Sequence, residues 1–241
     1  MAKPSAKPPR WYFSLRSPYS WFAYRDLMDR YRDVADALEW IPCWEPDDPT
    51  ARLLGDAGVE LPWVPMSRAK NFYVLQDARR LAHERGLTMT WPIDRDPHWD
   101  VAHLGHLAAE QAGLGRAYVD LVYRARWEHG RDICDRAVIG DIAVQLGLER
   151  DRLAAACDSP RLQRAGADVL TRSYHDGAFG VPFFILGREK YFGTDRLPAF
   201  VRAFRETYAA PPDALPNPAS DEPLAGITAL GLDAGHAGGC G

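Results

Sequence analysis

The chain has 241 residues, of which 46% are hydrophobic, so it can bury a sizeable core in one large domain or in a small domain that carries an inserted one. Its 29 Lys and Arg residues and 33 Asp and Glu residues give a net charge of −4, which provides no basic field to attract nucleic acid or acidic lipid. No apolar run approaches the roughly 18 residues of a membrane-spanning helix, so we expect neither nucleic acid nor a membrane as a partner.

The cysteines indicate a reducing compartment. They are scattered without a C-x-x-C pair, at Cys43, Cys134, Cys157 and Cys240, which fits neither a disulfide framework nor a zinc site. Residues 1–10 are polar and proline-rich, with no apolar secretory segment, and we expect a flexible leader there. The predicted location is therefore cytoplasmic.

Near the N-terminus, an aromatic strand is expected to run directly into a helix. Residues 11–15 have the composition of a strand, and helical periodicity begins at Tyr19. Between them, Ser17 is a preferred N-cap and Pro18 a preferred first helical residue. Because a helix N-terminus exposes free N–H groups that can hold an anion such as a thiolate, Ser17 is either a simple cap or part of a binding site.

The remaining elements follow from periodicity and turn residues. A second strand at 38–43 is reached through a helix, so the first two strands should be parallel. From residue 65 the pattern is helical, and at Gly180 it changes to a hairpin of two strands, 181–186 and 190–192. Further helices are expected, in chain order, at 50–57, 68–85, 101–112 and 116–128, after Asp135, after Ser159, and at 197–208.

This layout predicts an α/β fold with one four-stranded mixed sheet. Residues 11–46 and 177–208 should build the sheet domain, and residues 47–176 a large all-helical insertion that covers one side of it. After residue 208, the proline, glycine and alanine content predicts a disordered tail over 209–241.

Two histidines on one expected helix are candidate metal ligands. His103 and His106 share a face with Glu110, but no tight four-ligand pattern accompanies them, so we expect no metal. Because that helix should border the cleft, His103 is predicted to contact a substrate instead. Tyr19 and Trp44 are predicted to line an aromatic substrate pocket.

Five stretches, taken in order, resemble one family: YFSLRSPYSWFA (12–23), RAKNFYVLQDARRLAHERGL (68–87), YRARWEHGRDICDRAVIGDIA (123–143), GAFGVPFFIL (177–186) and YFGTDRL (191–197). They are similar to the DsbA-like thioredoxin-fold family, and most of all to its branch of 2-hydroxychromene-2-carboxylate isomerases and kappa-class glutathione transferases. The resemblance implies that the mixed sheet is thioredoxin-like.

The resemblance also implies a set of site residues. Ser17 would point at the thiol of bound glutathione and stabilise its thiolate as the catalytic contact. Val181 and a cis Pro182 would face the cysteinyl part of the thiol peptide. Thr194 and Asp195 would bind its γ-glutamyl end, with Asp195 as the counter-ion of the α-ammonium group.

Two further positions are carried over for the substrate. Lys70 and Tyr73, at the start of the first inserted helix, would face the substrate mouth. The activity that the resemblance implies is isomerisation of an aromatic conjugated carbonyl compound, with glutathione or another small thiol as cofactor. A homodimer is also expected by resemblance.

Three other activities are alternatives to this interpretation. Ser17 and Ser20 stand where disulfide-forming relatives carry C-x-x-C, so dithiol exchange is not expected. A kappa-class-like glutathione transferase, which keeps the thiol adduct, stays open. So does a thiol-independent tailoring or binding protein for polycyclic aromatic natural products. The loss of thiol chemistry is favoured because the segment 56–60 (DAGVE) lacks the family's usual asparagine, and a tailoring role is suggested by the unusual stretch 42–64.

Overall fold

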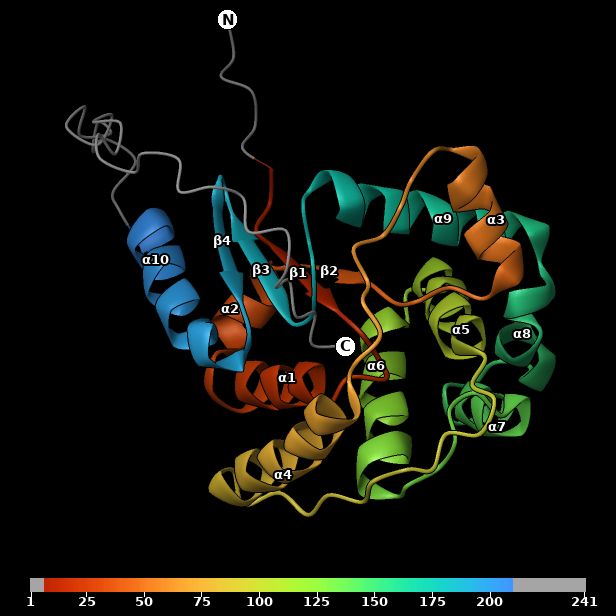
Figure 1. Cartoon of the computed structure of the whole chain (residues 1–241), viewed down its shortest axis with the longest axis horizontal. Helices are drawn as coiled ribbons and strands as arrows, with labels where there is room; N and C mark the ends of the chain where they lie inside the picture. Colours follow the sequence, from red (N-terminus) through yellow and green to blue (C-terminus); the bar gives the residue numbers. More distant parts are fainter. Residues whose placement is uncertain (1–6, 210–241) are drawn as a thin grey trace, which may run out of the picture.

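A four-stranded mixed sheet forms the centre of the molecule (Figure 1). The computed structural model describes residues 7–209. Strand β1 (Arg10–Phe13) pairs in parallel with β2 (Glu39–Pro42) and antiparallel with β3 (Phe183–Leu186), and β4 (Glu189–Phe192) completes the order β2-β1-β3-β4. The predicted α/β class is confirmed, and the two N-terminal strands join the C-terminal hairpin in one sheet as expected.

Aromatic pairs across the strands fill the core. Trp11 lies opposite Trp40 on one side and Phe184 on the other, and its ring stacks on Phe184 at 6.1 Å between centroids. All four residues of β1 are buried because helices cover both faces of this central strand. Phe200 packs on Phe184 from a helix outside the sheet, at 5.0 Å.

Helices from the two chain ends pack near the strands. Helix α1 (Pro18–Arg30) follows β1, the short α2 (Arg32–Ala37) leads into β2, and α10 (Leu197–Ala209) packs on β3 and β4. A 3-10 turn, Thr194–Arg196, precedes α10.

The regular elements between β2 and β3 are all helices, joined by several long loops, and most of this segment lies on the right in Figure 1. Helices α5 and α9 pack on one another in this region, and α9 also reaches β2. Its helices are α3 (Asp48–Asp56), α4 (Arg68–Glu84), α5 (Trp99–Gln111), α6 (Gly115–Tyr123), α7 (Arg136–Gln145), α8 (Arg150–Ala154) and α9 (Pro160–His175).

One expected helix, 116–128, is divided in the structure. Helix α6 ends at Tyr123 and continues as a π-helical turn, Arg124–Glu128. Within that turn Arg126 and Trp127 are both buried, and Arg126 forms two 2.8 Å hydrogen bonds to Asp94. The ion pair thereby fastens the loop before α5 to the end of α6.

The chain ends lie largely outside the described part. The leader predicted at 1–10 is described only from residue 7, and of the tail predicted at 209–241 only residue 209 is described. Among the helices within 7–209, none combines the length and the apolar character needed to cross a membrane.

We expect Phe184→Ala to lower the free energy of unfolding by about 3–5 kcal/mol, because it leaves a void between Trp11 and Phe200 at the centre of the sheet. Chemical denaturation of the two proteins measures the change. Val144→Ala, on an exposed position of α7, is the matched control and should change the value by less than about 0.5 kcal/mol. A small loss in Phe184→Ala would contradict this packing.

Candidate functional site

The turn between β1 and α1 carries the predicted catalytic serine. Ser17 is the N-cap of α1, and its Oγ accepts a hydrogen bond from the Ser20 backbone N–H at 3.3 Å. Pro18 occupies the first helical position, as expected. The free N–H groups and positive end of α1 are thus directed at this turn.

Two loops at the other end of the chain meet one another. The Val181–Pro182 peptide bond before β3 is cis, as the resemblance implied. After β4, the Gly193 N–H donates to the Pro182 carbonyl oxygen at 2.9 Å. This bond places Thr194 and Asp195 beside the cis peptide.

These loops, α1 and α4 enclose a cavity of about 740 Å³. Its wall contains the four residues predicted to bind the thiol peptide and two of those predicted to contact substrate. The lining residues are Tyr19, Tyr73, Asp77, Leu81, Val181, Pro182, Lys190, Tyr191, Phe192, Gly193, Thr194, Asp195 and Arg196.

Ser17 lies below this surface. Its side chain has no exposed area and is not part of the cavity lining. Lys70, although on α4 as expected, also lies outside the lining. The structure therefore brings Val181, Pro182, Thr194 and Asp195 together, with Ser17 covered rather than open to a ligand.

Sequence reasoning missed a contact that ties α4 to α1 across this cavity. The Tyr19 hydroxyl donates to Asp77 Oδ2 at 2.9 Å, and Asp77 also pairs with Arg80 at 3.0 Å. The spacing of Asp77 on α4 gave no signal for this role, because the partner lies 58 residues away. The cavity also contains Lys190 and Arg196, which the motif comparison did not single out.

Trp44 and His103 lie elsewhere. Both are fully buried, their rings stack at 4.9 Å with an interplanar angle of 7°, and neither lines the 740 Å³ cavity. Trp44 Nε1 donates to Asp100 Oδ1 at 2.7 Å. The structure therefore places these two predicted substrate contacts in the interior, stacked on one another, because α5 turns this face toward the core.

His103 is held as a neutral ring. Burial lowers its pKa to about 3, and burial lowers the pKa of His106 to about 4. Burial also raises the pKa of the Asp100 carboxyl, which accepts hydrogen bonds from Trp44 and Thr50.

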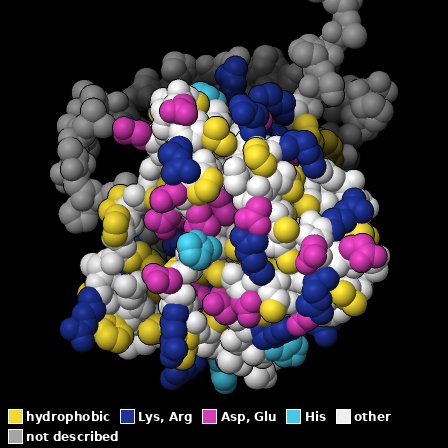
Figure 2. Space-filling model, turned by 90° about the vertical axis from the view of Figure 1, so that its right-hand side faces the viewer, with side chains coloured by type: hydrophobic (Ala, Val, Ile, Leu, Met, Phe, Trp, Pro, Cys, Tyr) yellow, Lys and Arg dark blue, Asp and Glu magenta, His cyan; other side chains and the backbone are white. Residues whose placement is uncertain are grey.

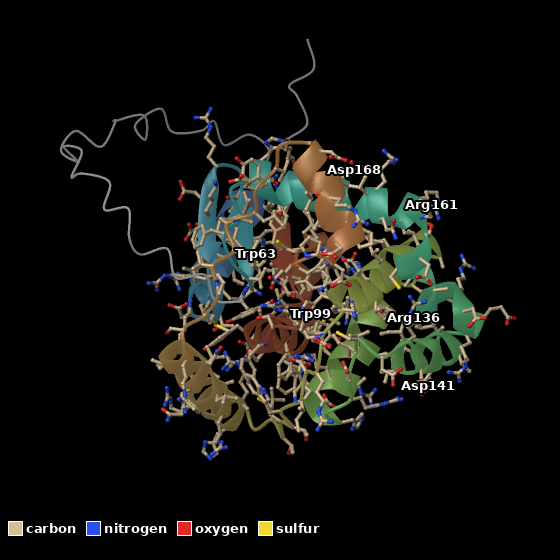
Figure 3. All side chains as sticks on the ribbon, turned by 45° about the vertical axis from the view of Figure 1, so that its right-hand side comes forward. Trp63, Trp99, Arg136, Asp141, Arg161 and Asp168 are labelled. Atoms are coloured by element: carbon tan, nitrogen blue, oxygen red, sulfur yellow. The ribbon has the colours of Figure 1, made fainter. Side chains whose placement is uncertain are left out.

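A second cavity, of about 720 Å³, opens where the 45–49 segment meets the start of α5. It shares no lining residue with the first. Acidic side chains gather near the middle of this side of the molecule, with a histidine beside them (Figure 2). In Figure 3, Trp99 lies near the centre of the molecule and Arg136 toward its outer edge; both contribute to the lining. The ionisable lining residues are Glu45, Asp47, Asp48, His98, Asp100, Cys134, Arg136, Cys157 and Asp158.

Within residues 7–209, no group of three or more His, Cys, Asp or Glu side chains is arranged to hold a metal ion. Asp47 and Asp100 instead bind the backbone N–H of one another, at 3.1 and 3.3 Å, which closes the entry to α5.

The fold agrees with the comparisons. The family model described as DSBA-like thioredoxin domain matches residues 10–205, and the chain belongs to this family.

Known relatives include an isomerase. The chain is 28% identical, over 191 residues, to 2-hydroxychromene-2-carboxylate isomerase of Sphingobium xenophagum, a match that covers 77% of this chain and 92% of that protein. A solved 2-hydroxychromene-2-carboxylate isomerase superposes with a TM-score of 0.65 at 23% identity, covering 83% of this chain and 97% of that one. Cytosolic disulfide reductase DsbM of Pseudomonas aeruginosa with GSH has a TM-score of 0.54 at 21% identity, with the same coverage. These two structures show the shared fold.

Gly193→Ala should disturb the cavity from its backbone. Gly193 has φ +96°, and a Cβ there would lie 2.7 Å from Asp195 Oδ1. We expect a loss of about 1–3 kcal/mol in the free energy of unfolding and a displaced Asp195 carboxylate. Denaturation and a structure of the variant measure both; Gly147→Ala, at φ +74° with nothing near its Cβ, separates backbone strain from the collision.

Stability should fall as the pH drops below 6.5. The unfolded chain takes up protons on its histidines near pH 6.5, whereas burial keeps His106 unprotonated down to about pH 4 in the native state, so acid favours unfolding. Between pH 7 and pH 5, the free energy of unfolding of His106→Phe should fall by about 1–2 kcal/mol less than that of the unmodified protein. Urea denaturation at the two pH values tests this, and equal losses in both proteins would contradict it.

Proposed function

We propose that this protein is a glutathione-dependent isomerase of an aromatic conjugated carbonyl compound, similar in activity to 2-hydroxychromene-2-carboxylate isomerase. The observation that carries the proposal is the cavity lined by the cis Val181–Pro182 loop, by Asp195 and by Tyr19, which lies in the first turn of α1. The isomerase relative at 28% identity supports the same reaction class.

The proposed ligand placement follows the charges of the wall. Asp195 is 71% exposed and its one ion pair within 7–209, to Arg196, is long at 3.5 Å, so its carboxylate is accessible to an α-ammonium group. The backbone of Val181 beside the cis bond offers peptide-like contacts to the cysteinyl part. The thiol would then be directed at Ser17 and the start of α1.

The proposed reaction is a reversible conjugate addition. The positive end of α1 and the Ser17 hydroxyl lower the free energy of the thiolate, whose sulfur adds to the enone carbon while the electron pair of the double bond moves to the carbonyl oxygen. The bond that was double is now single and rotates. The enolate then restores the double bond and expels the thiolate, so the thiol is regenerated and nothing is consumed.

The rest of the cavity wall suits an aromatic, anionic substrate. Tyr73, Tyr191 and Phe192 offer ring surfaces. Lys190 and Arg196 supply positive charge for a carboxylate or an enolate oxygen. Dithiol exchange is not proposed, because Ser17 and Ser20 occupy the positions where a redox pair would stand.

One observation favours a second candidate, a thiol-independent protein that binds aromatic compounds. Ser17 is fully covered, so a thiol reaches it only after the covering side chains move. A glutathione transferase that retains the adduct uses the same residues and differs only in its product. We further propose a cytoplasmic homodimer that binds a small aromatic substrate and has glutathione or another small thiol as its cofactor.

Ser17→Ala should reduce kcat/KM for isomerisation about 100-fold, because it removes a donor to the thiolate. Bound glutathione should also show a higher thiol pKa in this variant, measured from thiolate absorbance as the pH is raised. If the protein binds no glutathione and Ser17→Ala leaves the activity unchanged, the thiol mechanism is wrong and the thiol-independent candidate stands.

Asp195→Asn should weaken glutathione binding roughly 2- to 5-fold in calorimetric titration, since the carboxylate is solvent-exposed and the lost charge pair is screened. The same Asp-to-Asn change at Asp168, an exposed residue of α9 outside the cavity (Figure 3), is the matched control and should leave affinity unchanged. Equal affinities for the unmodified protein and Asp195→Asn would remove Asp195 from the proposed site.

A further inference from the structure

The turn that presents Ser17 leaves a buried donor that it cannot satisfy itself. The Ser17 N–H donates to the Ser14 carbonyl oxygen at 3.2 Å, which closes a four-residue turn. The Arg16 N–H reaches the Ser14 hydroxyl at 3.4 Å. The Leu15 N–H points out of the turn into the protein interior, where a donor without an acceptor is unfavourable.

His103 supplies the missing acceptor from α5. Its Nε2 accepts from the Leu15 N–H at 3.1 Å and lies 3.3 Å from the Ser14 hydroxyl oxygen. Its Nδ1 lies 2.8 Å from the Trp99 carbonyl oxygen. The Leu15 backbone N–H can only donate, and the Trp99 carbonyl oxygen can only accept. The ring therefore bonds to both groups only as the neutral tautomer with the proton on Nδ1.

The ring is fixed in turn by its neighbours. Trp44 stacks on it in near-parallel orientation, and Trp44 is held by its hydrogen bond to Asp100. Asp100 is itself fixed by Thr50 and by the Asp47 N–H. A contiguous chain of buried contacts therefore extends from the 47–50 segment to the turn that carries Ser17.

We propose that His103 is the positioning residue of the thiol site: by accepting from the Leu15 N–H it sets the turn that aims the Ser17 hydroxyl and the start of α1. This role rests on the proposed function. It differs from the substrate contact expected from the sequence, because both ring nitrogens are occupied by backbone groups and the ring has no exposed area.

Two substitutions of His103 in the full chain distinguish the loss of the hydrogen-bond acceptor for Leu15 from the loss of ring stacking on Trp44. His103→Phe keeps an aromatic ring against Trp44 and removes the acceptor. His103→Gln loses the ring and offers an amide oxygen close to the position of Nε2. His106→Phe makes the same change three residues along α5, at a buried histidine with no hydrogen bond to the turn among those of residues 7–209, and is the control.

The readouts are amide exchange at Leu15 by NMR, the pKa of the bound glutathione thiol, and kcat and KM for isomerisation. In His103→Phe we expect Leu15 exchange at least 10-fold faster, a higher thiol pKa, and kcat at least 10-fold lower with KM for glutathione changed less than 3-fold. In His103→Gln all values should return to within about 3-fold of the unmodified protein, and His106→Phe should match it.

Unchanged Leu15 exchange and thiol pKa in a folded His103→Phe would overturn the proposal, as would His103→Gln behaving like His103→Phe. If His103→Phe does not fold, the smaller His103→Leu takes its place. Failure of the proposed function gives a different result: the unmodified protein then leaves the thiol pKa of glutathione unshifted and Ser17→Ala has no effect. Leu15 exchange alone then decides whether His103 sets the turn.

Discussion

At the end of β1, buried backbone N–H and carbonyl groups need hydrogen-bond partners, and the site depends on this constraint. The strand enters a turn inside the core, where water cannot satisfy its polar groups. Side chains distant in sequence do so instead: His103 accepts from Leu15, and the Tyr123 hydroxyl donates to the Ser14 carbonyl oxygen at 3.1 Å. Both come from the helical segment between β2 and β3. The helices therefore do more than cover the sheet, since they determine the shape of the turn that carries Ser17.

The same helical segment also contains a buried polar side chain whose hydrogen bonds are satisfied within the protein. Asp100 is almost fully buried, yet each of its carboxylate oxygens has a donor, from Trp44 and Thr50. A partly satisfied network would destabilise the core, whereas a complete one specifies a single arrangement. This explains how a stretch with poor periodicity, 44–64, still places Trp44 against His103. The acidic second cavity is the outer edge of this network.

Local signals were sufficient for most of the fold. Ser17-Pro18 and Ser159-Pro160 are cap-and-proline pairs, and both helices begin there. Motif resemblance also placed the cis Pro182 loop beside Asp195, because short turns fix those positions. Contacts between distant segments gave no such signal. The periodicity of α5 puts His103 on an apolar face but does not say whether that face meets a cleft or the core, and the Tyr19–Asp77 bond depends on how α4 packs.

Helix α4 is a weakly packed wall of the cavity. This 17-residue helix buries only Val74, Ala78 and Ala82, and its contact with the body is chiefly with α1. Few buried apolar contacts mean a low free energy for local opening. The Tyr19–Asp77 hydrogen bond joins this loosely held helix to the rigid α1, so the wall of the cavity has one firm side and one compliant side. The turn with Ser17 belongs to the firm side, because His103 and Tyr123 hold it from within. Helix α4 is therefore the side of the cavity that can move, whereas the turn and α1 are fixed.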